Sequence, residues 1–177
     1  MKPLIDTAPG FDQPIAVLKH CHDRIRKQLG TLERLLVHLP EFGANLDAQQ
    51  AANSIMQYFN KAADKHHADE EQDLLPMLEE TATGDDAALL RSLMPELLQQ
   101  HRQMDAAWQV LNGQLKQIAA GDSAMLSEQD VTGFTQMYTA HMLTEETHIA
   151  PMAKRIFSDA QMAQLGDAMR ERRSIAK

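Results

Sequence analysis

The chain has 177 residues, of which 44% are hydrophobic, and a formal net charge of −8. This length suits one domain over residues 1–177, and the acidic balance disfavours nucleic acid as a partner because phosphate backbones would be repelled. No apolar run approaches the roughly 18 residues that span a bilayer, so we expect a cytoplasmic protein with no membrane partner.

A first helix is predicted from Pro14, a residue type that favours the first helical turn, to about Leu39. Its apolar residues recur at steps of three and four, and His22 fills a gap in that stripe. The imidazole of His22 is therefore expected to face inward. Cys21 points away from this face and is interpreted as a bystander thiol.

A second helix is expected after the segment 40–46, with Asp47 as its capping residue. Its inward stripe comprises Ile55, Phe59, Ala62, His66, Glu70 and Met77. His67 lies outside this stripe and is expected to be solvated. Pro76 predicts a kink or break, because proline lacks the backbone N–H that a helix needs.

A third helix is predicted up to residue 120, with His101 in its apolar stripe and a kink at Pro95. Ser127 is expected to cap a fourth, which carries a further kink at Pro151. The fourth stripe comprises Val131, Phe134, Tyr138, His141, Glu145, His148 and Met152. Ser158 and Gln161 match a capping box for a short last helix that packs outside the others.

These elements predict an all-α fold, an antiparallel up-down-up-down four-helix bundle with a short extra C-terminal helix. The bundle is expected over about residues 12–157 and the C-terminal helix over about 159–172.

One motif occurs twice: a histidine is followed four residues later by two glutamates and ten residues later by a proline. The copies are His66, Glu70, Glu71 and Pro76, and His141, Glu145, Glu146 and Pro151. Residues four apart share a helix face about 6 Å apart, so each copy can direct an imidazole and a carboxylate at one ion. Counted from the hairpin loops, His22 and His101 fall at a similar depth, so all six side chains could meet at one level.

Burying two ionised glutamates costs several kcal/mol each unless a cation lies beside them. The pattern therefore predicts a metal site. The candidate ligands are His22, His66, Glu70, His101, His141 and Glu145. Four imidazoles and two carboxylates suit iron, manganese or zinc. If each glutamate bridges two ions, each ion has four protein ligands and open positions for a small diatomic or peroxide ligand. A diferric pair would favour an oxo or hydroxo bridge.

Four segments, CHDRIRKQL, HHADEEQDLLPMLE, QQHRQM and HMLTEETHIAP, resemble the hemerythrin-like HHE cation-binding family. The resemblance spans about residues 12–157 and implies an antiparallel four-helix bundle around a non-haem di-iron centre. It also implies terminal and bridging ligands: the terminal ones are His22, His66, His101 and His141, and the bridges are Glu70 and Glu145.

Two positions depart from the oxygen-carrying hemerythrins. Asp105 stands where those proteins have a further histidine, and Glu146 stands where they have an aspartate ligand. Reversible oxygen storage with five histidines is therefore not expected. The ligand set looks more like that of di-iron proteins that repair iron–sulfur clusters under nitrosative stress, whose cysteine-bearing N-terminal module this sequence does not contain.

The leading hypothesis is a non-haem di-iron protein that binds or reacts with O2, NO or peroxide, in the oxidative or nitrosative stress response or in iron handling. A ferroxidase- or peroxidase-type di-iron enzyme and a metal-dependent sensor or structural module remain alternatives. The sequence leaves open whether three further residues take part in the metal site. His148 has the ferritin-type spacing from Glu145, Asp105 is expected at the helix surface, and Tyr138 is expected in the core.

Overall fold

The computed structural model describes residues 8–175, which form helices and turns without a strand. The α-helices are α1 (Pro14–Phe42), α2 (Leu46–Tyr58), α3 (Asp64–Asp69), α4 (Leu75–Thr81), α5 (Gly84–Ala120), α6 (Glu128–Thr144), α7 (Ala150–Ile156) and α8 (Asp159–Arg172). Three short π-helical segments interrupt them, namely η1 (Phe59–Ala63), η2 (Glu70–Leu74) and η3 (Glu145–Ile149). The predicted all-α class is confirmed.

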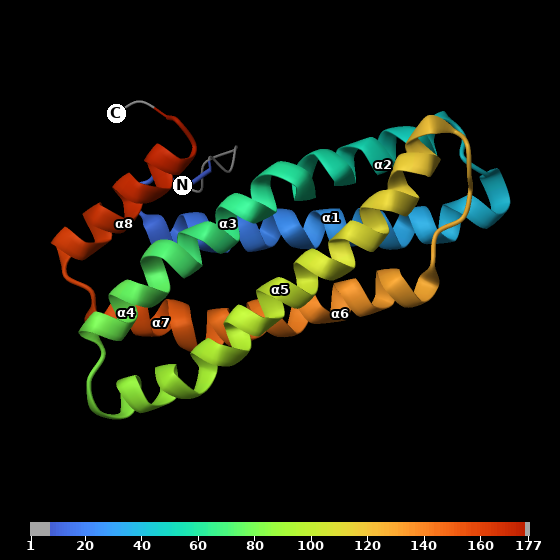
Figure 1. Cartoon of the computed structure of the whole chain (residues 1–177). Coiled ribbons are helices and arrows are strands. Elements are labelled where there is room, and N and C mark those ends of the chain that lie inside the picture. The colour runs from blue at the N-terminus through green and yellow to red at the C-terminus, as the bar shows by residue number, and fades with distance from the viewer. Residues whose placement is uncertain (1–7, 176–177) are drawn as a thin grey trace, which may run out of the picture.

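Several of these elements join end to end into longer rods (Figure 1). One rod runs from α2 through η1, α3 and η2 to α4, and another runs from α6 through η3 to α7. The α1 helix contacts α2 and α6, while α5 contacts the same two elements from the other side, so the rods enclose a common interior. The α8 helix packs outside, against α1, α3 and η2.

Within residues 8–175, no helix is both long enough and apolar enough to cross a bilayer.

The helix boundaries follow local capping chemistry. Asn45, not the predicted Asp47, caps α2, because its side-chain oxygen accepts a hydrogen bond from the Ala48 N–H at 3.0 Å. Asp47 lies in the first turn instead, where a carboxylate favours the positive end of the helix. Ser127 caps α6 and Ser158 begins the capping box of α8, both as predicted.

The segments η2 and η3 occupy the same place in the two copies of the motif. Each begins at the first glutamate and ends two residues before the proline, Pro76 or Pro151. Proline lacks an N–H and crowds the carbonyl four residues earlier, so the turn before it widens. The α5 helix, by contrast, continues through Pro95 and bends in its early turns (Figure 1).

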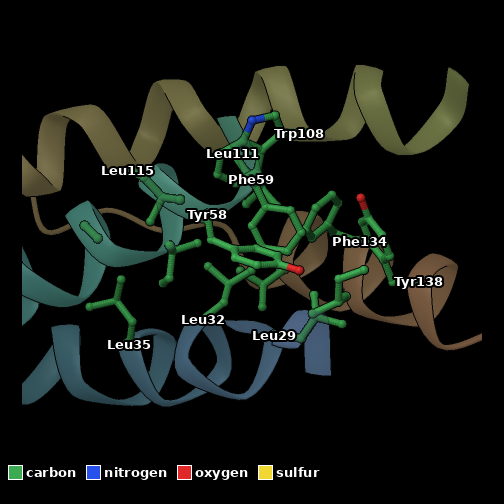
Figure 2. Packing of buried hydrophobic residues seen from close by; sticks show 14 of the residues in the cluster. Leu29, Leu32, Leu35, Tyr58, Phe59, Trp108, Leu111, Leu115, Phe134 and Tyr138 are labelled. Carbon is green, nitrogen blue, oxygen red and sulfur yellow. The ribbon is translucent and has the colours of Figure 1, made fainter. Parts of the chain in front are cut away.

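Two apolar clusters fill the interior, one towards each end of the rods. Figure 2 shows the first cluster, in which the Phe59 ring packs among side chains of α1, α5 and α6. On α1, His22 lies between Leu18 of the second cluster and Ile25 of the first. His101 holds the equivalent place on α5. A polar layer therefore separates the two apolar clusters.

Candidate metal centre

All six predicted site residues are buried and lie together in this polar layer. They form two overlapping groups of four in which the potential ligand atoms lie within 4.8 Å of one another. One group is His22, His66, Glu70 and Glu145, and the other is Glu70, His101, His141 and Glu145. Both glutamates belong to both groups, so the geometry offers two adjacent positions for a cation.

Each carboxylate faces one imidazole of each group. The Glu70 oxygens lie 3.2 Å from Nε2 of His66 and 3.3 Å from Nε2 of His101. The Glu145 oxygens lie 3.1 Å from Nε2 of His22 and 3.1 Å from Nε2 of His141. Two ligand atoms bonded to one ion at about 2.0–2.2 Å stand roughly 3 Å apart, so these spacings match a shared coordination sphere.

Three of the four imidazoles are oriented by hydrogen bonds from their outer nitrogen. The Nδ1 atoms donate to side-chain oxygens in three pairs: His22 to Glu146 at 2.9 Å, His101 to Glu71 at 2.7 Å and His141 to Gln100 at 2.8 Å. Because these oxygens accept hydrogen bonds and cannot donate them, Nδ1 holds the proton. The Nε2 lone pair of each ring then points into the polar layer, as in metal-bound histidines.

The nitrogen and oxygen atoms that point into the polar layer repel one another unless a cation lies between them. Nε2 of His101 and Nε2 of His141 lie only 3.0 Å apart, and two lone pairs at that distance repel each other. Within residues 8–175, one oxygen each of Glu70 and Glu145 and Nε2 of His22 are buried without a hydrogen-bond partner. Unpaired buried acceptors are costly, whereas a bound cation would satisfy all of them. The residues present therefore fit a metal site.

The electrostatics of the layer agree with this assignment. Burial raises the pKa of Glu70 well above its ordinary value, and the charge of Glu145 raises it further. Burial lowers the pKa of His66 well below its ordinary value, with the neighbouring His22 adding to the effect, so that ring is neutral and can act as a ligand. Ionising Glu70 beside a charged Glu145 is thus unfavourable until positive charge enters the layer.

The expectation that His67 is solvated is wrong. Its side chain is buried, and its ring stacks on that of His101 with centroids 4.1 Å apart. The reason is η1, because a π-turn adds a residue and rotates the following side chains away from the α-helical stripe. His66 and His67 consequently both face the interior.

The three residues left open by the sequence lie outside both groups of four. Asp105 is exposed and faces Nδ1 of His67 at 3.7 Å, and the interaction with His67 lowers the pKa of its carboxyl. Tyr138 is buried against Phe134 with ring centroids 5.0 Å apart, as expected of a core residue. His148 is only half-buried.

Sequence reasoning missed a charged cluster beside the polar layer. Asp69, which precedes Glu70, is fully buried and accepts hydrogen bonds from Arg172 at 2.5 Å and from Arg173 at 2.6 Å. Arg172 also donates to Asp73 of η2 at 2.5 Å. These bonds fasten the C-terminal end of α8 to the segment that carries Glu70. The only signal in the sequence was the basic end of the last predicted helix.

A helical protein with a buried cluster of imidazoles and carboxylates belongs to the class of metal-cation-binding helical bundles. The family model described as the hemerythrin HHE cation binding domain matches residues 13–153, and the chain belongs to this family. The chain is also similar to a protein of Haemophilus influenzae described as an uncharacterized protein, with 27% identity over 165 residues. That similarity covers 93% of this chain and 92% of the relative.

Proposed function

We propose that the chain is a non-haem di-iron protein that binds or reacts with O2, NO or peroxide, in the oxidative or nitrosative stress response or in iron handling. The terminal ligands in this proposal are four imidazoles, and Glu70 and Glu145 bridge the two ions. The observation that carries it is that each of these carboxylates faces one imidazole of each group. The proposal includes the single domain and the up-down-up-down order, which the contacts between successive rods support.

The surrounding residues would give the metal pair its reactivity by holding the ligands still. Glu71, Gln100 and Glu146 fix the imidazole rings, and Arg26 in turn holds Glu146 with hydrogen bonds of 2.8 and 2.9 Å. The first apolar cluster limits the entry of water from its end of the bundle. When bound, an iron pair would supply redox chemistry towards small oxygen- or nitrogen-containing molecules. Four protein ligands per ion leave room for such a molecule.

Metal analysis tests this proposal most simply. Protein produced in iron-supplemented cells should contain two iron ions per chain by elemental analysis and should absorb in the near ultraviolet after oxidation. A colourless protein that retains zinc and excludes iron would contradict the proposal.

The chemistry with peroxide separates the leading function from the ferroxidase or peroxidase alternative. An adduct-forming protein should consume about one equivalent of NO or peroxide per centre, whereas an enzyme should turn over Fe(II) with peroxide many times. Retention of the fold and of partner binding without metal would favour the sensor or structural alternative over both.

Removing the hydrogen bond behind one imidazole should weaken metal binding. The Glu146→Ala variant is expected to lose about 10- to 100-fold in metal affinity, because Glu146 orients His22 and fixes its tautomer. Competition with a chelator of known affinity measures the change. Glu33→Ala, an exposed substitution on the same α1 helix as His22, serves as the control. Equal affinities for the two variants would show that the hydrogen bond has no such role.

A further inference from the structure

A cavity of about 390 Å³ reaches the polar layer from the side of α1 and α7. Its inner end is formed by His22, Glu70 and Glu145, three of the proposed ligands. Most of its remaining wall is apolar and comprises Ile15, Leu18, Leu74, Ile149, Ala150 and Pro151. A water molecule takes up about 30 Å³ in the liquid, so this space is roughly tenfold larger than a diatomic ligand requires. The volume falls in the range of sites for organic ligands.

Two exposed lysines, Lys19 of α1 and Lys154 of α7, line the same cavity and mark its opening to solvent. Lys19 lies one turn from His22, and Lys154 lies nine residues beyond Glu145, which corresponds to about 13 Å along a helix. Glu146 also lines the cavity, but its carboxylate is already engaged by His22 and Arg26. The opening of this acidic protein is therefore positively charged, and on the α7 side the apolar residues Ile149, Ala150 and Pro151 separate Lys154 from the polar layer.

We propose that this cavity binds an amphipathic organic anion, namely a carboxylate with an unbranched alkyl chain of medium length. The head group lies between Lys19 and Lys154, and the chain lies along Leu18, Ile149 and Pro151 with its end directed towards the metal centre. This inference rests on the proposed function in one respect, because the anion would be an organic ligand held next to the proposed metal pair.

Charge and shape each make a separate demand on the ligand. The two ammonium groups select an anion over a neutral or cationic molecule of the same length, and their exposure limits each contribution to that of a surface ion pair. The apolar wall selects a chain over a bare carboxylate, because burial of each methylene group adds to the affinity. Neither demand would be met by O2, NO or peroxide.

Calorimetry with octanoate tests the inference on both the metal-loaded and the metal-free protein. Octanoate should bind at least about tenfold more tightly than octanol, which lacks the charge, and than acetate, which lacks the chain. The Lys19→Ala/Lys154→Ala double variant should weaken octanoate binding by about tenfold. Lys27→Ala, another exposed lysine of α1 that does not line the cavity, should leave it unchanged.

A blocking substitution provides a second, independent test. Ala150 is half-buried in the cavity wall, so Ala150→Trp should fill the space and abolish octanoate binding while circular dichroism confirms the fold. Ala51→Trp, at a half-buried alanine of α2 that lines another pocket, should bind octanoate as the unchanged protein does. Full binding by Ala150→Trp, or equal affinity for octanol and octanoate, would overturn the inference.

The metal content of every sample keeps the two proposals apart. Two bound ions without octanoate binding would overturn this inference and leave the proposed function standing. If the protein took up no metal pair even in iron-supplemented cells and still bound octanoate, the proposed function would be overturned and the cavity would be supported as an anion site in its own right.

Discussion

Replacing Glu70 or Glu145 with alanine is expected to remove at least one metal ion from each chain. Each carboxylate lies within 3.3 Å of an imidazole from both groups, so a single substitution takes a ligand from both ion positions at once. Replacing one terminal imidazole, such as that of His66, takes a ligand from only one position. Elemental analysis after gel filtration should therefore show a greater loss for either glutamate variant than for His66→Ala.

Glu79→Ala supplies the matched control, because Glu79 is an exposed glutamate of α4 a short distance along the same rod. This variant should keep its full metal content. If Glu70→Ala or Glu145→Ala also kept both ions, the assignment of these residues as bridges would be wrong.

The second large effect is expected at Asp69. The Asp69→Ala variant should lower the free energy of unfolding of the metal-free protein by about 3–5 kcal/mol, the usual cost of breaking a buried ion pair from one side. The substitution leaves Arg172 and Arg173, whose side chains are 18% and 16% exposed, without their main anionic partner. Urea denaturation followed by circular dichroism measures the change.

Asp73→Ala is the appropriate comparison for this effect. Asp73 accepts one hydrogen bond from Arg172, but its side chain is 23% exposed, so water can replace the lost contact. Its substitution should cost about 1 kcal/mol or less. Similar losses for Asp69→Ala and Asp73→Ala would show that burial of the Asp69 carboxylate contributes little to holding α8 in place.

The periodicity of the sequence was sufficient to predict the helical class and the burial of all six site residues. Apolar residues at steps of three and four define which face of each helix is inside, and polar residues within that stripe must be buried with it. The repeated motif then placed Glu70 and Glu145 at equivalent depths. Their meeting in one layer follows from helix length alone, since each residue adds a fixed rise.

Periodicity fails where the helix ceases to be α-helical. The prediction for His67 assumed a constant turn of 3.6 residues, whereas η1 widens the helix just before it. No proline lies within η1, so the sequence contained no local sign of that change. The turns before Pro76 and Pro151 could be expected to deviate because proline has a known steric cost.

Contacts between distant segments were the other feature that could not be predicted from the sequence. The pairing of Glu146 with His22 and of Asp69 with Arg173 depends on how neighbouring helices are rotated and spaced. A single sequence contains no direct record of either quantity. The second glutamate of each motif was nevertheless a usable sign, because Glu71 and Glu146 both turn out to orient a histidine from another helix.

The central claim is that Glu70 and Glu145 together hold two metal ions. Anomalous diffraction at the iron edge, from crystals of iron-loaded protein, tests it most directly. We predict two anomalous peaks about 3.5–4 Å apart between these carboxylates, one beside His22 and His66 and the other beside His101 and His141. A single peak, or none in this layer, would contradict the account.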